Sequence, residues 1–282
     1  MKKSLTQLLV HFDASPRAVQ RLEYARLVAQ PFAAATTALY AAAPIFMDLP
    51  FVPPVIGPGV VYSPYDHYDD GQMARARASF DQWLSSSSDA RVSWADIHDV
   101  PVVPAFARQA LYADLMVLGQ HEPSGTQPVH VPADFADAVM ADRGKPALIV
   151  PYAVVPATVG ETIVIAWKET REAARAVAAA MPLLQNARQV HVVSWADVDP
   201  RIDGDRLDLN SYLKLSGVQA TWHYQGKETD NLGELLLSRV FDLRADLLVM
   251  GCYGHSRARE WVLGGTSRTL LQSMTLPVLM AQ

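Results

Sequence analysis

The second half of this chain repeats the first, and this repeat limits the folds open to it more than any other feature. Residues 113–119 read Ala-Asp-Leu-Met-Val-Leu-Gly, and residues 245–251 match them at five of seven positions at an offset of 132. Residues 145–150 parallel 276–281 at an offset of 131, and residues 8–12 parallel 163–167 at an offset of 155. A repeat that runs along the chain predicts two copies of one domain.

The first copy contains an insertion, because the offset falls by 23 between the early and the late matches. Residues 44–66 are rich in proline and glycine, which remove hydrogen-bond donors and add backbone freedom. We therefore expect a loop there rather than a core element. The copies are expected at residues 1–155 and 160–282.

Apolar runs alternate with helical patterns in both copies. Leu8–Phe12 and Thr162–Trp167 are mostly apolar, as strands buried on both faces of a parallel sheet should be. A helical pattern follows each run, and we expect the side chains of Ser15 and Thr170 to cap the two helices. Strands alternating with helices predict the α/β class with a parallel sheet, formed twice.

Further elements are expected in the second copy. Strands are expected at residues 189–194, 218–224, 246–250 and 278–280, and helices near residues 206–215, 230–243 and 266–273.

Composition excludes several classes of protein. Half of the 282 residues are hydrophobic and 19% are charged, which favours a globular core. The net charge of −5 argues against a general nucleic-acid surface, and the single cysteine excludes an intramolecular disulfide framework. No apolar run reaches the ~20 residues of a membrane span, and no signal-peptide core follows Met1. We expect a cytoplasmic protein without a membrane segment.

One glycine-rich segment carries the clearest functional signal. It begins at Gly251, directly after the expected strand 246–250, and it runs to Ser267 at the start of the expected final helix. Gly251 and Gly254 allow the backbone to approach a ligand closely. The free N–H groups and the dipole at the start of the final helix favour an anion there. Neither a P-loop nor Gly-x-Gly-x-x-Gly is present in this segment.

The spacing Gly251-x2-Gly254-x9-Gly264, with its flanking strands, resembles that of the universal stress protein family. The resemblance covers both copies and so indicates a tandem two-domain member. It implies two Rossmann-like domains, each with a mostly parallel five-stranded sheet flanked by helices. It also implies pairing through the last strand of each domain, near residues 148–150 and 278–280, so the two domains are expected to pair with each other. Further homodimerisation of the chain stays open.

The resemblance also implies ATP or AMP binding in some members, and it assigns candidate residues. The candidate nucleotide-binding residues are Gly251, Tyr253, Gly254, His255, Gly264, Gly265, Thr266, Ser267, Trp167 and Lys168. No metal ligands and no catalytic residues are expected, since the histidines at 121, 223 and 255 show no ligand spacing.

The two copies depart from the family pattern in different ways. Binding members carry Ser or Thr directly after the last motif glycine, where this chain has Gly265. They also carry an aspartate after the first strand, which the first copy retains as Asp13 and the second replaces with Lys168. In the first copy Glu122 stands in place of the second glycine and would repel phosphate. The first site is therefore expected to be degenerate.

Several residues have a plainer alternative role. In these alternatives Asp13 orients the first helix, Trp167 only packs, and Lys168 is an exposed loop residue. Cys252 lies inside the glycine segment, where it is either an oxidant sensor with a lowered pKa or a small packed residue.

Three functions are compatible with these features. The first is a nucleotide-responsive stress protein that acts through regulatory protein contacts. The second is an interaction scaffold that binds no nucleotide. The third, a slow ATPase or a related enzyme, has the least support, because no paired carboxylates or nucleophile–base pair lie near the motif.

Overall fold

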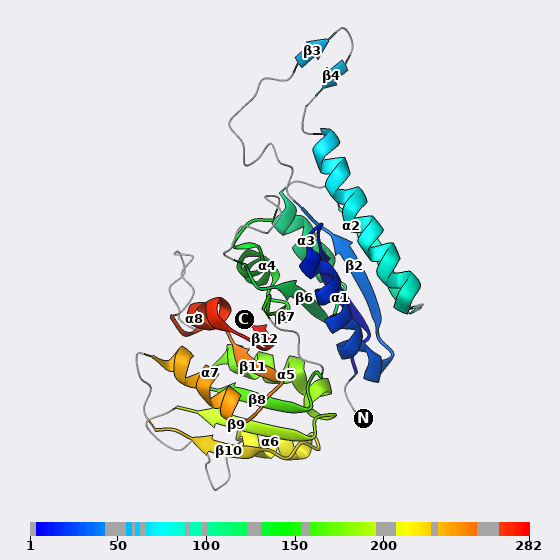
Figure 1. Cartoon of the computed structure of the whole chain (residues 1–282). Helices are drawn as coiled ribbons and strands as arrows, with labels where there is room; N and C mark the ends of the chain where they lie inside the picture. Colours follow the sequence, from blue (N-terminus) through cyan, green and yellow to red (C-terminus); the bar gives the residue numbers. More distant parts are fainter. Residues whose placement is uncertain are drawn as a thin grey trace.

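The computed structural model describes residues 4–42, 55–57, 60–62, 66–87, 89, 91–97, 101–122, 131–153, 158–195, 207–226, 231–252 and 265–282. Ten strands form one continuous sheet through the middle of the molecule (Figure 1).

The first half contains the elements up to β7. They are β1 (Gln7–Phe12), α1 (Pro16–Ala29), the 3-10 helix η1 (Gln30–Phe32), β2 (Ala35–Tyr40), β3 (Val55–Gly57), β4 (Val60–Tyr62), α2 (Asp66–Ser87), β5 (Val92–Asp96), α3 (Val102–Ala110), β6 (Leu115–Gly119), α4 (Phe135–Arg143) and β7 (Ala147–Val150).

The second half contains the remaining elements. They are β8 (Thr162–Trp167), α5 (Arg171–Leu184), β9 (Gln189–Ser194), α6 (Leu209–Leu215), β10 (Thr221–Tyr224), α7 (Leu232–Asp242), β11 (Leu247–Gly251), α8 (Gly265–Ser273) and β12 (Val278–Ala281).

The strand order repeats in the two halves. It runs β5-β2-β1-β6-β7 and continues as β12-β11-β8-β9-β10, so the halves mirror each other about the β7–β12 pair. That pair is antiparallel, with Leu148 opposite Leu279, whereas the other neighbours in the sheet are parallel. The predicted α/β fold, with a mostly parallel five-stranded sheet in each half, is confirmed.

The insertion contains one feature that its composition did not predict. β3 and β4 pair as an antiparallel hairpin separate from the main sheet, and they lie well away from it in Figure 1. The hairpin agrees with the expectation that this stretch is no core element. The rest of residues 43–65 lies outside the described part of the chain.

The two helix starts differ from each other. The Thr170 hydroxyl accepts a hydrogen bond from the Ala173 backbone N–H at 3.3 Å, which confirms the predicted cap of α5. Ser15 occupies the cap position of α1, but its side chain makes no capping bond, so that part of the prediction is wrong. The Ser15 hydroxyl donates instead to Asp13 Oδ1, which forms a charge-assisted hydrogen bond to a buried carboxylate.

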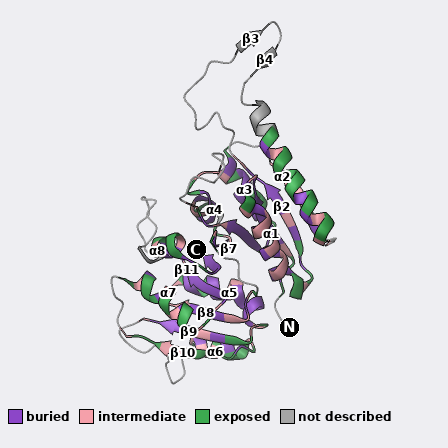
Figure 2. Ribbon diagram, in the orientation of Figure 1, coloured by how far each residue is buried: buried purple, intermediate pink, exposed green. Residues whose placement is uncertain are grey.

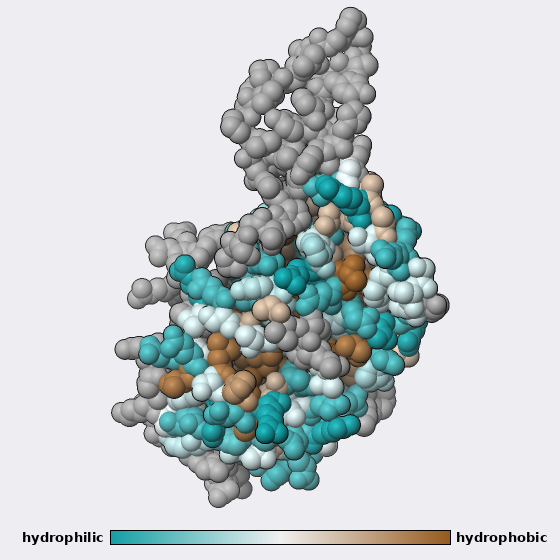
Figure 3. All heavy atoms as spheres, viewed as in Figure 1, coloured by the Kyte–Doolittle hydropathy of each residue, from teal (hydrophilic) through white to brown (hydrophobic). Residues whose placement is uncertain are grey.

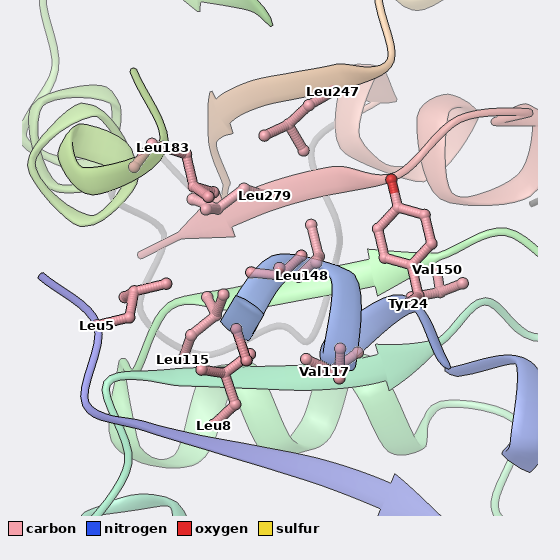
Figure 4. Packing of buried hydrophobic residues seen from close by; sticks show 14 of the residues in the cluster. Leu5, Leu8, Tyr24, Leu115, Val117, Leu148, Val150, Leu183, Leu247 and Leu279 are labelled. Atoms are coloured by element: carbon pink, nitrogen blue, oxygen red, sulfur yellow. The ribbon is translucent and has the colours of Figure 1, made fainter. Parts of the chain in front are cut away.

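Apolar side chains pack on both faces of the sheet. The inner strands are the most buried elements, whereas most residues of the edge strands β5 and β10 are intermediate or exposed (Figure 2). One face packs against α1, α2, α5 and α6, and the other packs against α3, α4, α7 and α8. The first cluster is shared between the halves, since it contains Leu148 and Leu279 from the central strand pair. Figure 4 shows these residues beside Tyr24 of α1, whose hydroxyl donates to the Asp246 carbonyl at 3.5 Å.

The repeated Ala-Asp-Leu segment has a structural role in both halves. Asp114 Oδ2 accepts hydrogen bonds from the N–H groups of Thr6 and Gln7, at 2.6 and 3.1 Å. Asp246 accepts from the N–H groups of Glu161 and Thr162, both at 3.0 Å. Each aspartate therefore fixes the start of β1 or β8 to the strand beside it.

The hydropathy of the molecular surface agrees with a fold whose apolar layers are buried. On the face drawn in Figure 3, hydrophilic residues cover most of the described surface and hydrophobic ones gather in small patches. Among the described residues, no helix combines the length and the apolar character needed to cross a membrane.

Candidate functional site

The candidate site of each half lies where two neighbouring parallel strands end and a helix begins. Gly119 ends β6 and Gly251 ends β11, each beside the first strand of its half. Crevices at the carboxyl ends of strands are the usual ligand sites of such sheets. What fills the space beside each glycine differs between the halves.

In the first half, the space beside Gly119 is filled by Arg21 of α1. A Cβ atom on Gly119 would lie 2.7 Å from Arg21 Nη1. Arg21 is only 5% exposed, its Nη2 donates to Asp13 Oδ2 at 2.8 Å, and its Nε donates to the His11 carbonyl at 3.0 Å. The guanidinium therefore occupies the strand ends and pairs with the aspartate that the family resemblance had assigned to nucleotide.

The buried group of Arg21, Asp13 and His11 favours a charged Asp13 and a neutral His11. Burial opposes ionisation of Asp13, but Arg21, His11 and the hydrogen bonds from Ser15 outweigh it and lower the pKa of Asp13 to about 2. Burial, followed by the charge of Arg21, lowers the pKa of His11 to about 4. His11 is therefore neutral at pH 7, and its Nε2 donates to the Ala41 carbonyl at 2.8 Å.

Glu122 of the first half also has a partner within the chain. Its carboxylate pairs with Arg17 of α1, with 3.4 Å between Oε1 and Arg17 Nη2. Asp13 accepts the backbone N–H of Ser15 at 2.8 Å, so it also orients the start of α1. The ionic groups at these strand ends thus satisfy one another.

In the second half, α5 itself packs against the end of β11. A Cβ atom on Gly251 would lie 2.5 Å from the Ala173 backbone nitrogen and 2.7 Å from the Glu172 carbonyl carbon. Only glycine allows this approach without moving the helix. At the offset of 155, Ala176 stands where the first half has Arg21, so no guanidinium comes from that position.

A buried carboxylate accompanies the second site. Glu172, at the offset position of Arg17, is 4% exposed and forms an ion pair with Nε of Arg171. The hydrogen bond from Arg171 lowers the pKa of Glu172 against the effect of burial. Glu172 is therefore charged at pH 7 and is neutralised by Arg171.

The predicted site residues are only partly placed. Gly251 ends β11, Trp167 ends β8 and packs partly against the core, and Lys168 is exposed just after it. Gly265, Thr266 and Ser267 open α8, and Ser267 is buried. Tyr253, Gly254, His255 and Gly264 lie outside the described residues.

The structure also adds residues that the sequence did not single out. Arg17, Arg21 and Glu172 line the strand ends, yet none belongs to the glycine motif. Arg21 could have been noticed, because it is a charged residue beside the apolar stripe of α1. Its pairing with Asp13 depends on the fold.

Cys252 has the environment of a packed residue. It is 2% exposed, and burial, followed by the charges of Asp137 and Glu172, raises the pKa of its thiol to about 12. A thiol that stays protonated is a poor nucleophile, which argues against the oxidant-sensor reading. Within the described residues, no group of three or more His, Cys, Asp or Glu side chains is arranged to hold a metal ion.

Solved structures with the same fold are known. A universal stress protein from Archaeoglobus fulgidus DSM 4304 aligns with a TM-score of 0.70 at 17% identity, covering 98% of this chain and 96% of that one. A protein of unknown function from Pseudomonas aeruginosa PAO1 aligns with a TM-score of 0.60 at 16% identity, covering 98% and 92%. A putative universal stress protein from Pseudomonas aeruginosa UCBPP-PA14 aligns with a TM-score of 0.57 at 15% identity, covering 98% of this chain and 92% of that one.

These alignments cover both halves together. The predicted resemblance to universal stress proteins, in tandem, is therefore confirmed at the level of the fold. No protein-family model matches the sequence, and no curated protein matches it either.

Proposed function

We propose, from the premise that this chain carries the universal stress protein fold twice, that it is a stress-response protein of that family. The second domain, residues 160–282, binds ATP or AMP, and the bound state changes regulatory contacts with other proteins. The first domain, residues 1–155, binds no nucleotide and supports the second. The protein works in the cytoplasm, where a reducing environment suits its buried thiol.

The difference between the two glycine positions is the observation that carries this proposal. At Gly119 the strand ends are filled by Arg21, which pairs with Asp13. At Gly251 the corresponding helix position is Ala176, and the glycine motif leads from there into α8. The start of α8 supplies backbone N–H donors and a favourable dipole for phosphate.

A scaffold without nucleotide is the second candidate, and Glu172 favours it. A buried carboxylate beside Gly251 opposes a phosphate group unless Arg171 keeps its charge neutralised. In this alternative, both halves serve only to display surfaces for partner proteins.

Titration of the full chain with labelled ATP and AMP separates the two candidates. We expect one nucleotide per chain, and we expect Gly254→Glu to abolish binding, because it adds to the second site a carboxylate like Glu122. The matched control is His121→Glu, which adds the same charge at an exposed position of the first half. Absence of binding at ~1 mM nucleotide would overturn the nucleotide proposal and leave the scaffold as the remaining candidate.

A further inference from the structure

A chain of basic side chains lies under α7, on the face of the sheet that this helix covers. His191 of β9 and His223 of β10 are joined by a contact of 3.1 Å between Nδ1 and Nε2 respectively. Arg239 of α7 continues the chain, with 3.4 Å between its Nη2 and His223 Nδ1. We call these three residues the basic cluster.

The direction of the hydrogen bonds follows from Arg239, because a guanidinium can only donate. His223 Nδ1 must then accept, so the proton of this imidazole is on Nε2 and is donated to His191 Nδ1. The proton of His191 is consequently on its Nε2. Both imidazoles are neutral in this arrangement, and the only full charge within the basic cluster is that of Arg239.

Among the described residues, little compensates the charge of the half-buried Arg239. Its Nε is buried and has no hydrogen-bond partner in the described part of the chain. The described carboxylates of α7, Glu234 and Asp242, are exposed, and none of the ion pairs between described residues includes Arg239. A buried donor without a partner is costly, and in native proteins such a group often marks the place of a water or an ion.

We propose that the basic cluster is a binding site for a small oxyanion of the phosphate class. Arg239 offers planar guanidinium donors, which suit the oxygens of a phosphate. The imidazoles of His223 and His191 lie beside it and can supply further donors when protonated. A metal ion fits less well, because the guanidinium would repel it.

This site is separate from the proposed nucleotide site. The two histidines lie within β9 and β10, whereas Gly251 is the last residue of β11. β9 and β10 form the outer edge of the second half, with β8 between them and β11. The proposal therefore stands whether or not the glycine motif binds nucleotide.

Binding should strengthen as the pH falls. Burial, followed by the charge of Arg239, lowers the pKa of His191 and of His223, and His191 lowers that of His223 further. Among the described charged groups of β9, β10 and α7, only Arg239 shifts the pKa of His191, and only Arg239 and His191 shift the pKa of His223. A bound anion offsets the charge of Arg239, raises both histidine pKa values and so binds more tightly where the histidines protonate.

Calorimetric titration of the full chain with inorganic phosphate, at pH 6 and pH 8, tests the site. We expect binding at both pH values. The affinity for the phosphate dianion, corrected for the protonation of phosphate itself, should be tighter at pH 6, and Arg239→Gln should weaken it about tenfold or more. The matched control is Arg188→Gln, which removes the same charge from a side chain that is 78% exposed. Equal affinities in the two variants, or no binding by the unmodified chain at ~10 mM phosphate, would overturn the proposal.

A second variant and a second readout cover the case in which Arg239→Gln does not fold. His223→Gln keeps a hydrogen-bonding side chain but cannot titrate, so it should retain phosphate binding while losing much of the pH dependence. In histidine NMR spectra, phosphate should raise the pKa of His191 and of His223. The signals of exposed His121, far along the chain in the first half, serve as the internal reference. If saturating phosphate left the pKa values of both His191 and His223 unchanged, the proposed anion site at the basic cluster would be wrong.

Glycerol phosphate distinguishes the two possible sources of the anion. Binding of inorganic phosphate alone would indicate a free ion as the ligand. Binding of both probes, with the same sensitivity to Arg239→Gln, would indicate a phosphate monoester carried by a small metabolite. Either result supports an oxyanion site at the basic cluster.

Discussion

The stability of the first half depends on how Arg21 compensates Asp13. Both side chains are almost fully buried, at 7% and 6% exposure, and Nη2 and Oδ2 are 2.8 Å apart. Replacing Arg21 with methionine leaves a buried carboxylate without its partner. We expect the free energy of unfolding at pH 7 to fall by about 3–5 kcal/mol, as measured by urea denaturation.

A double-mutant cycle separates loss of the pair from loss of packing. Asp13→Asn combined with Arg21→Met should cost clearly less than the sum of the two single changes. Arg188→Met is the matched control and should cost under about 1 kcal/mol, since its ion pair with Glu161 is exposed. Additive effects of Asp13→Asn and Arg21→Met would mean that the two charges do not stabilise each other.

At the candidate site, the sequence predicts roles that depend on neighbouring residues but not partners that only the fold brings together. The local pattern predicts the cap at Thr170, and the structure confirms it. The glycine pattern predicts that Gly251 lets the backbone approach a ligand, whereas in the structure it allows the close approach of α5. The partner of Asp13 was not identified, because Arg21 lies eight positions later and reaches it only after α1 packs on β1. The predicted cap at Ser15 is wrong for the same reason, because the Ser15 hydroxyl bonds to the Asp13 carboxylate, which is buried only in the folded chain.

At the scale of elements, apolar runs predict the presence of strands well and their first and last residues less well. The bounds of β8 and β9 agree with the expected strands, because continuous apolar runs mark strands covered on both faces. β10 begins at Thr221 rather than at residue 218. Val218 is buried like a strand residue, but its N–H donates to the Leu213 carbonyl and ends α6 instead.

The repeated aspartates offer a matched comparison between two equivalent elements. Asp246 is buried and accepts three hydrogen bonds, from Thr158 Oγ1 and two backbone N–H groups, whereas Asp114 is exposed and accepts two. We expect Asp246→Ala to lower the free energy of unfolding by about 2–4 kcal/mol and Asp114→Ala by about 1 kcal/mol. Urea denaturation of both variants measures the difference. A larger cost for Asp114→Ala would show that burial does not set the strength of these bonds.

At the scale of the whole molecule, the two halves share one sheet and one set of apolar layers. The antiparallel β7–β12 pair connects the two five-stranded portions, and cores on both faces contain residues from both halves. Gln120 of the first half donates through Nε2 to the Leu271 carbonyl of α8 at 2.9 Å. The repeat predicted two domains, but their merger into one layered body depends on these contacts between distant segments.

Such a body should unfold as a unit, because separating the halves exposes the apolar residues of the central strands to water. We expect Arg21→Met, a change in the first half, to reduce hydrogen-exchange protection of β8 and β11 as much as that of β1 and β6. Mass spectrometry of the full chain measures both sets of amides, at conditions where exchange reports global unfolding. If β8 and β11 kept their full protection in this variant, the second half would be stable without the first, and the central strand pair would be a contact between two independent domains.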